Sequence, residues 1–261
     1  MYLAILFIMS LCASSVGAVC GVGGGVIIKP ALDALGLTDV SSASFLSACT
    51  VLIMTGYSVF KEIKSPDKKL DMVHMPPLAF GAAIGGVAGK YIFEKVKSLL
   101  PFADMVGAYQ AVFLGIIATG LLIYTIKKQN IKTKRIDGRT ICFLFGIALG
   151  CMSSFLGIGG GPIDLVILMY FFSMDTKTAA QNSLFIIFIA QLFSLGYTFC
   201  SGSVPAVKTI EVLLMVAGGF AGGIMGRKIN ATIDNNAVDK LFIILLGVIM
   251  LISIYNFFRY I

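Results

Sequence analysis

Eight long apolar stretches separated by short polar segments run along this chain of 261 residues. A helix needs about 20 largely apolar residues to cross a bilayer, so the pattern predicts eight transmembrane helices. The expected ranges are 2–20, 42–60, 73–93 and 106–126 in one half of the chain, and 140–157, 178–200, 208–226 and 239–258 in the other. We therefore expect an all-α integral membrane protein with four transmembrane helices in each half.

A glycine-rich run interrupts the apolar pattern once in each half. The run Gly21-Val22-Gly23-Gly24-Gly25 corresponds to Gly157-Ile158-Gly159-Gly160-Gly161. Each run precedes an apolar piece too short to cross a bilayer, Val26–Leu35 and Pro162–Phe172. Unpaired backbone groups inside a membrane are tolerated where they line a cavity or are buried in protein. We expect each run to break a helix and each short piece to form a half-helix or a re-entrant segment.

A second pair of matching segments supports an internal duplication. Residues 81–90 and 218–227 carry glycine at every fourth position and end in a basic residue. We divide the chain into a first transmembrane repeat (1–126), a basic linker (127–139) and a second repeat (140–261). Small residues four apart allow close helix packing, so we expect these two helices to lie near a pseudo-twofold axis, although glycine is also common in membrane helices generally. Re-entrant short pieces make the repeats parallel; a short piece that crosses makes them inverted.

Composition excludes a soluble protein of this size. Hydrophobic residues make up 58% of the chain, charged residues 13%, and the mean hydropathy is +0.96. The six cysteines lie in or beside apolar stretches, form no CxxC pair and have no His nearby, so we expect packing residues, with no metal and no cofactor. The start of the chain has no basic segment before its apolar run, and we expect a retained helix rather than a cleaved signal peptide.

Positive charge is concentrated in loops. The net charge is +7, but the basic residues lie in short segments between spans, which argues for membrane topology and against a nucleic-acid partner. The linker holds the densest group: Lys127, Lys128, Lys132, Lys134, Arg135 and Arg139. We expect this linker to be cytoplasmic and, with eight spans, both termini to be cytoplasmic as well. This arrangement leaves Lys90, Lys95 and Lys97 on the outer side, where they would have to snorkel from helix ends.

The glycine runs are the candidate binding site. A helix that begins inside the membrane presents unpaired amides and a partial positive charge at its N-terminus, and glycine lets a ligand approach closely. Two such ends facing each other suit a small oxyanion. The candidate binding residues are Gly23, Gly24, Gly25, Gly159, Gly160 and Gly161. The alternative is close helix packing without a ligand.

Polar side chains follow each short piece at matched places. The candidates to contact the anion are Ser47 and Thr50 in the first half, and Asn182, Ser183 and Gln191 in the second. Neutral hydroxyl and amide donors can bind an anion without holding it in a salt bridge, which suits a carrier that must release its load. The alternative is hydrogen bonding between helices.

Two charged residues lie in the short apolar pieces. Asp164 is the carboxylate placed well inside an apolar segment, where an ionised Asp costs about 2.5–3.5 kcal/mol. It either couples transport to protons or sodium, or satisfies local amides at the positive end of a half-helix. Lys29 either supplies positive charge to the cavity or snorkels toward the membrane surface.

The two glycine runs, Pro30 with Leu32 after the first, and the four-plus-four hydrophobic layout resemble the TauE/SafE permeases, also called sulfite exporters. The resemblance implies transport of small sulfur-containing anions, such as sulfite or organosulfonates, across the cytoplasmic membrane of prokaryotes. The second half departs from the pattern, because Val166 stands where Pro30 would align and Pro162 and Asp164 are added. This departure leaves the second half-helix and the substrate open.

The expected partners are a small anionic substrate and the lipid bilayer, with a homo-oligomer as an option. Moving one negative charge outward along an inside-negative potential releases about 2.3 kcal/mol per 100 mV, so export can run without a coupling ion, whereas uptake needs co-transported cations. A membrane enzyme or assembly factor for a sulfur compound is the alternative class. The spans and loops carry no pair of catalytic acids, no Ser with a His partner and no metal-ligand cluster, so we expect no enzyme. A cation channel or carrier would need more intramembrane carboxylates.

Overall fold

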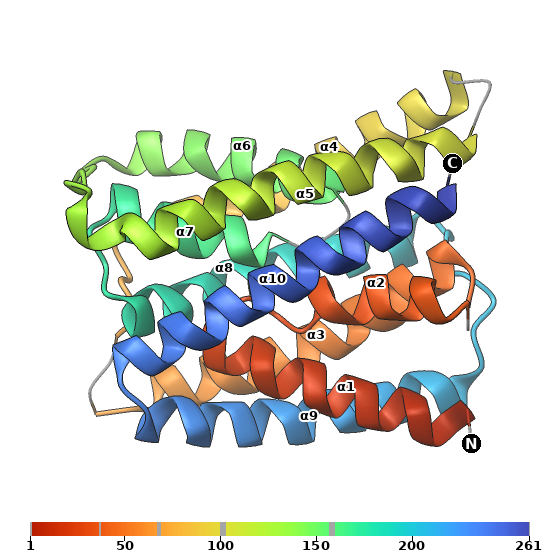
Figure 1. Ribbon diagram of the computed structural model, residues 1–261, viewed down its shortest axis with the longest axis horizontal. Helices are drawn as coiled ribbons and strands as arrows, with labels where there is room; N and C mark the ends of the chain where they lie inside the picture. Colours follow the sequence, from red (N-terminus) through yellow and green to blue (C-terminus); the bar gives the residue numbers. More distant parts are fainter. Residues whose placement is uncertain (1, 37, 67–68, 100–102, 157–159, 261) are drawn as a thin grey trace.

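A computed structural model describes residues 2–36, 38–66, 69–99, 103–156 and 160–260, and these residues form ten α-helices and no strand (Figure 1). The helices are α1 (Tyr2–Cys20), α2 (Gly25–Leu35), α3 (Val40–Ile63), α4 (Met75–Leu99), α5 (Ala103–Lys127), α6 (Arg139–Leu156), α7 (Gly161–Phe171), α8 (Thr176–Cys200), α9 (Thr209–Thr232) and α10 (Asn235–Tyr260), with a short 3-10 helix, η1 (Lys128–Asn130). The all-α prediction is confirmed for these ranges.

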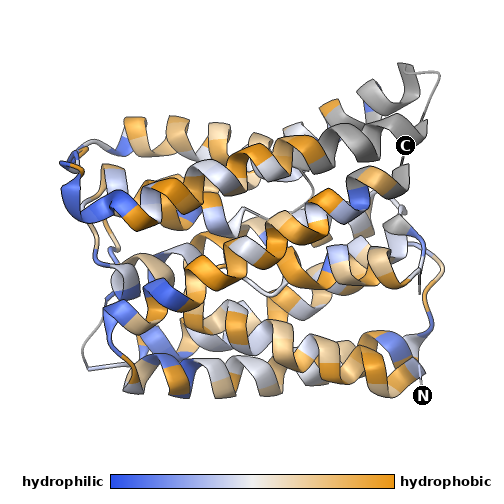
Figure 2. Cartoon of the chain, viewed as in Figure 1, coloured by the Kyte–Doolittle hydropathy of each residue, from blue (hydrophilic) through white to orange (hydrophobic). Residues whose placement is uncertain are grey.

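Within the described residues, six helices are long and apolar enough to cross a membrane: α1, α3, α5, α8, α9 and α10. The apolar parts of α6 and α7 are shorter. Figure 2 shows hydrophobic residues along most of each helix and hydrophilic residues gathered toward the ends of the bundle. This distribution identifies a multi-pass membrane protein, while the full set of eight spans stays a prediction.

The apolar pattern breaks at both glycine runs. Helix α1 ends at Cys20, where Gly21 adopts φ 73° and the Val22 N–H donates to the Gly17 carbonyl at 3.0 Å. This six-residue closure with a left-handed glycine is a common way for a helix to end, because it pairs a carbonyl that the last turn leaves free. Helix α7 begins just after Gly160, which has φ 84°. Residues 157–159 of the second run lie outside the described residues.

Helix α2 turns back toward the end of the bundle from which α1 started, so α1 and α2 form a hairpin (Figure 1). Helices α3, α4 and α5 then run back and forth along the bundle, and the linker after α5 lies at the end opposite both termini. The linker and the termini, which the sequence predicts together on the cytoplasmic side, thus lie at opposite ends of the bundle. The sequence prediction counted α1 as a complete crossing, whereas the α1–α2 hairpin returns to the end where it began. Which end is cytoplasmic stays a prediction.

The glycine-rich helices pack closely, but not chiefly against each other. Helix α4 makes its most extensive contact with α6, and α9 with α1. A Cβ on Gly85 would overlap the Ile147 carbonyl of α6, and one on Gly222 would contact the Leu11 carbonyl of α1. The close approach predicted from the small residues is present. Each of the two helices lies along the broken helix of the other half, and their expected place near a pseudo-twofold axis stays a prediction.

Two helices begin with the same cap in the two halves. Asp39 before α3 and Asp175 before α8 are extended, and each side chain accepts a backbone hydrogen bond from the residue three positions later, Ser42 or Thr178. Such a cap satisfies an amide that the first helical turn leaves unpaired. Helices α3 and α8 are thus fixed at their first residue, and both pass beside the broken helices in the core.

Candidate functional site

The two glycine turns meet in the interior. Gly161, the first residue of α7, lies so close to the Val22 backbone that a Cβ would overlap the Val22 carbonyl. A Cβ on Gly21 would overlap Ala180 of α8, and Gly23 lies against the Ile187 side chain of the same helix. The breaks of α1 and α6 therefore face each other beside α8, and the helices that follow them both begin near this point.

Two serine hydroxyls lie beside the start of α2. A Cβ on Gly24 would lie 3.1 Å from the Ser14 Oγ of α1. A Cβ on Gly25 would lie 3.1 Å from the Ser47 Oγ of α3. Ser14 is fully buried, and its Oγ has no hydrogen-bond partner among the described residues. The Ile27 and Ile28 N–H groups donate to the Gly24 carbonyl. The backbone amides before Ile27 therefore have no acceptor within α2. Amides without an acceptor inside α2 and two serine hydroxyls thus converge at this turn.

The start of α7 carries a buried acid. Asp164 is 3% exposed, and its Oδ1 has no hydrogen-bond partner in the part of the chain that the structure describes. The Asp164 Oδ2 and the Ser153 Oγ of α6 both lie within 2.8 Å of the position of a Gly160 Cβ. The second turn therefore differs from the first, because it places a carboxyl group where the first half has Ile28, a fully buried apolar residue.

The predicted polar residues divide into two groups. Ser47, Thr50 and Ser183 are buried in α3 and α8; the Ser183 Oγ lacks a described partner, whereas Thr50 donates to the Leu46 carbonyl at 2.8 Å. Asn182 instead holds the loop before α4, because it accepts from the Asp71 N–H at 2.9 Å and donates to the Lys69 carbonyl at 2.8 Å.

The remaining predicted residues lie apart from the meeting of the turns or outside the description. Gln191 is half-buried in α8, beyond the residues that contact the first turn. Lys29 is half-buried in α2, one turn after Gly25. Gly159 lies outside the described residues, whereas Gly160 and Gly161 are buried at the turn. The role of these residues as solute contacts stays a prediction.

A charged network at the linker end was not predicted. Arg227 of α9 donates through Nη2 to the Glu62 Oε2 of α3 at 2.9 Å, and through Nη1 to the Ser58 carbonyl at 3.1 Å and the Gln181 Oε1 of α8 at 3.4 Å. The Glu62 Oε1 accepts from the Lys69 N–H at 2.9 Å. The signal that could have found it is Arg227 itself, the basic residue that ends the repeated glycine segment.

The same network reaches the end of the broken helix. Asn230 of α9 donates to the Val19 carbonyl in the last turn of α1 at 2.7 Å, and accepts from the Gln181 Nε2 at 3.3 Å. Because the last carbonyls of a helix have no partner within it, the Asn230 amide replaces a bond that α1 lost when it broke. The α1 terminus is therefore tied through Gln181 to the Arg227–Glu62 ion pair.

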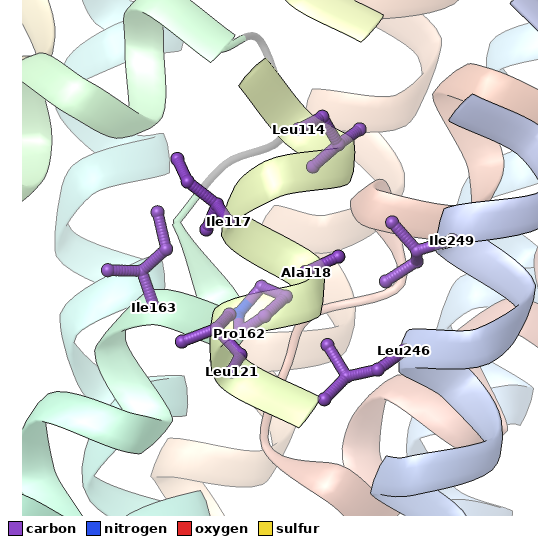
Figure 3. Close-up of a pocket in the computed structure, with 8 residues that line it drawn as sticks. All are labelled: Leu114, Ile117, Ala118, Leu121, Pro162, Ile163, Leu246 and Ile249. Carbon is purple, nitrogen blue, oxygen red and sulfur yellow. The ribbon is translucent and has the colours of Figure 1, made fainter. Parts of the chain in front are cut away.

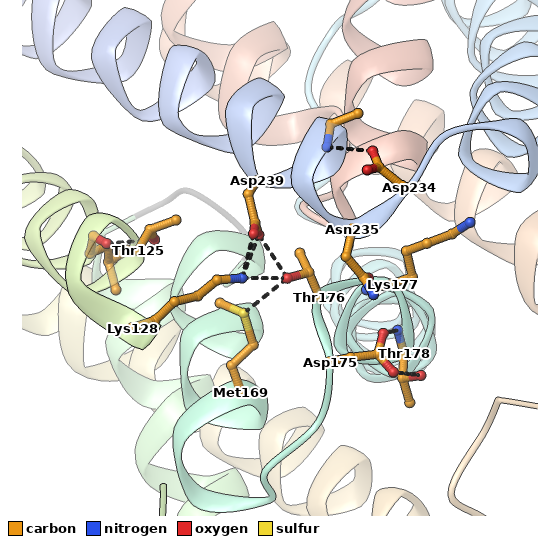
Figure 4. Close-up of polar contacts among 12 residues, drawn as sticks. Thr125, Lys128, Met169, Asp175, Thr176, Lys177, Thr178, Asp234, Asn235 and Asp239 are labelled. Atoms are coloured by element: carbon orange, nitrogen blue, oxygen red, sulfur yellow. Dashed lines mark hydrogen bonds and ion pairs between the residues drawn. The ribbon is translucent and has the colours of Figure 1, made fainter. Parts of the chain in front are cut away.

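A second charged cluster ties the linker to the bundle (Figure 4). The Lys128 Nζ lies 2.6 Å from Asp239 of α10 and donates to the Thr176 Oγ1 of α8 at 2.7 Å; Thr176 donates to Asp239 at 2.7 Å. All three groups are thus satisfied within one cluster at the start of α8. The cluster therefore ties the linker to the first residues of α8 and α10, at the linker end of the bundle (Figure 1).

A small pocket beside α7 does not suit an anion. Its lining is wholly apolar, with residues of α5, α7 and α10 including Ala118, Pro162 and Leu246 (Figure 3). Its volume is about 10 Å³, roughly the space of one water molecule. Within the described ranges, no three His, Cys, Asp or Glu side chains come together in a way that could hold a metal ion.

Comparison with known proteins decides the family. The chain matches the family described as "Sulfite exporter TauE/SafE" over residues 6–253. The chain belongs to the TauE/SafE family. This TauE/SafE protein is 26% identical to the Bacillus subtilis protein named "Probable membrane transporter protein YunE", over 93% of this chain and 95% of that one. The TauE/SafE resemblance stated from the sequence is confirmed, and the protein is a membrane transporter of that family.

Other relatives cover less of the TauE/SafE chain. The "Probable membrane transporter protein YdhB" of Bacillus subtilis is 26% identical over 58% of this chain and 62% of its own length. The "Probable membrane transporter protein MamO" of Magnetospirillum gryphiswaldense is 28% identical over 36% of this chain and 16% of its own length. All three relatives are named as transporters rather than enzymes. No solved structure matches the chain.

Proposed function

We propose that this TauE/SafE protein exports a small sulfur-containing oxyanion, of the sulfite or organosulfonate type, across the cytoplasmic membrane. The meeting of the two glycine turns, with Gly161 against Val22, carries the proposal. It supports a single central site reached by the first turns of both α2 and α7. Helix N-termini attract anions because their amides are unpaired and their dipoles point the positive end outward.

The donors around the turns suit a carrier more than a permanent anion trap. The Ser14 and Ser47 hydroxyls flank the start of α2, and Ser183 is a further buried hydroxyl on α8 without a described partner. Neutral donors bind an oxyanion less strongly than a bidentate Arg would, so release costs less. We assign the amides near Gly23, Gly24, Gly25, Gly159, Gly160 and Gly161 as the main anion contacts.

The helix arrangement supports two inverted repeats of four spans each. Helix α6 runs opposite to α1 in Figure 1, and the main contacts are exchanged between halves: α1 with α9 corresponds to α6 with α4, and α3 with α9 corresponds to α8 with α4. In this arrangement α4 and α6 join the six long apolar helices as spans. Helices α2 and α7 carry the chain back to the end of the bundle where α1 and α6 began, so each half makes an odd number of passes and the second half is inverted. Movement of one repeat against the other would expose the site to each side in turn.

Charge supports a cytoplasmic linker with both termini on the outer side. The described basic residues of the linker end are Lys61, Lys64, Lys69, Lys127, Lys128, Lys132, Lys134, Arg135, Arg139, Lys177, Arg227, Lys228 and Lys240, against Lys29, Lys90, Lys95 and Lys208 toward the other end. Cytoplasmic loops of membrane proteins carry an excess of Lys and Arg. The transporter would therefore release its anion at the end where the termini lie.

A flux measurement in proteoliposomes tests the function. Sulfite loaded inside vesicles should leave faster with the full-length protein than in empty vesicles, and an imposed potential that is negative on the sulfite side should speed the flux. Chloride and sodium fluxes serve as controls for a non-selective pore. Chemical conversion of sulfite would support the enzyme alternative, and cation flux without an anion requirement would support a channel; either result removes the proposal.

Proton-coupled uptake is the second candidate function, and the unpartnered Oδ1 of buried Asp164 favours it. A carboxyl group without a described cationic partner in the interior is suited to carry a proton with the anion. Asp164→Asn should then abolish the response of sulfite flux to a pH gradient and leave potential-driven flux in place. Gradient-driven flux that is unchanged in Asp164→Asn would remove the coupling role.

A further inference from the structure

Two basic residues occupy corresponding places at opposite ends of the molecule. Lys90 ends the repeated glycine segment of α4, and Arg227 ends that of α9. Arg227 contacts α3 near its C-terminus, whereas Lys90 contacts α8 near its C-terminus, at Thr198. Glu62 and Thr198 are themselves corresponding residues, because they follow the matching caps Asp39 and Asp175 at the same interval of the chain. One contact of the fold is therefore present twice, once per half.

The Arg227 end is charge-compensated. The Glu62 side chain is 6% exposed and the Arg227 side chain 21% exposed, and both oxygens of Glu62 accept a hydrogen bond, one of them from the guanidinium. Arg227 also donates to the Gln181 Oε1 of α8, the helix that lies beside both glycine turns. A planar guanidinium that already holds a carboxylate has the geometry to hold a sulfonate or sulfite oxygen instead.

The Lys90 end carries a hydroxyl where the other end carries a carboxylate. The Lys90 Nζ donates to the Thr198 Oγ1 at 3.1 Å and lies 5.8 Å from the centre of the Tyr197 ring. The two ends thus present a positive group at the same place in the fold, one bound to a buried carboxylate and one bound to a hydroxyl.

We propose that Lys90 and Arg227 bind the transported anion at the two ends of its path, and that Glu62 competes with the anion for Arg227. This inference rests on the proposed anion transport and names residues that the glycine turns do not include. At the linker end, the entering anion displaces Glu62 from the guanidinium. At the other end, the anion displaces the neutral Thr198 hydroxyl from Lys90, so the two mouths differ in affinity because a carboxylate competes with the anion more strongly than a hydroxyl does.

Sulfite flux in proteoliposomes tests this inference. Glu62→Gln removes the competing charge and should lower the half-saturating sulfite concentration on the order of fivefold, since competing ligands of one site are coupled. Arg227→Gln and Lys90→Gln should raise that concentration. Arg227→Lys keeps the charge but loses the planar fork, and should fall between wild type and Arg227→Gln.

Asp239→Asn is the matched control. It removes a carboxylate from another ion pair at the same end, with Lys128, and should leave the half-saturating concentration unchanged. If the Arg227–Glu62 pair only holds the fold together, Glu62→Gln will behave like Asp239→Asn, lowering thermal stability without lowering the half-saturating concentration. That result would overturn this inference but leave the proposed anion transport intact, because wild type would still transport sulfite. Absence of saturable sulfite flux in wild type would remove the proposed function and this inference together.

Discussion

At the scale of single residues, the contact between Gly161 and the Val22 carbonyl allows a sharp prediction. A methyl group on Gly161 has no space, so Gly161→Ala must push the two glycine turns apart. Overpacking of this kind costs about 1–3 kcal/mol. We expect the midpoint of thermal unfolding in detergent to be lower than in wild type, as measured by size-exclusion chromatography of heated samples. We also expect loss of sulfite flux.

Gly247→Ala in α10 is the control for this substitution. A Cβ there meets no atom within 4 Å, and alanine favours a helix by up to about 1 kcal/mol relative to glycine. Its unfolding midpoint should match or exceed that of wild type. Equal midpoints for Gly161→Ala and Gly247→Ala would show that the turns are not in contact.

Individual side chains were the least predictable part of the site. Ser47, Thr50 and Ser183 are buried in α3 and α8, as their place in apolar helices suggested, but Asn182 bonds to the loop before α4. Which side of a helix faces which neighbour depends on tertiary packing, and hydropathy along α8 does not encode it. The Arg227–Glu62 pair was missed for the same reason, since its two residues are far apart in the chain.

At the scale of elements, the matching caps of α3 and α8 predict that removing either cap lowers the stability of the protein by a similar amount. Asp175→Ala and Asp39→Ala each remove the acceptor for an amide of the first turn, at Thr178 or Ser42. A lost N-cap typically costs about 1 kcal/mol. Each variant should unfold at a lower temperature than wild type, and the double variant should show roughly the sum because the caps lie at opposite ends of the bundle. An unchanged unfolding midpoint in both variants would contradict the stabilising role of the two caps.

The Asp175 cap also predicts a dependence on pH. Burial raises the pKa of Asp175, but the hydrogen bonds from the Thr178 N–H and hydroxyl, together with the Lys69 charge and the Lys177 N–H, outweigh it and leave the pKa below its ordinary value. The cap therefore stabilises the fold fully above the pKa of an unfolded Asp, near 4, and loses this effect as pH falls through the lower pKa of the folded state. The difference in unfolding midpoint between wild type and Asp175→Ala should shrink on acidification below about pH 4. A constant difference would contradict this assignment.

Helix positions were largely predictable, and their connections were not. Glycine runs and span lengths predicted the breaks before Gly25 and Gly161, because glycine and chain length act locally. The return of α2 toward the start of α1 could not be read from hydropathy, which gives the length of an apolar piece but not its direction. The sequence did carry a signal for the packing of α4 against α6, because Gly146 and Gly150 of α6 lie closely against backbone carbonyls of α4.

At the scale of the whole molecule, the placement of the linker opposite both termini predicts the sidedness of labelling. In a protein whose native cysteines are replaced, we expect a membrane-impermeant maleimide to label Ser203→Cys on intact cells and Lys132→Cys only after the membrane is opened. Ser203 lies in the loop between α8 and α9, at the end of the bundle that carries the termini. The reverse pattern of labelling would contradict the proposed orientation.

The exchange of partners between halves has a consequence for synthesis. Helix α1 leaves the ribosome long before α9, residues 209–232, yet its most extensive contact is with α9. Until then the grooves that receive the α9 glycines face lipid or the insertion machinery. Neither half, expressed as a separate polypeptide, contains the neighbour that its own broken helix needs, so protease-resistant product should form only when both fragments are made together in one cell.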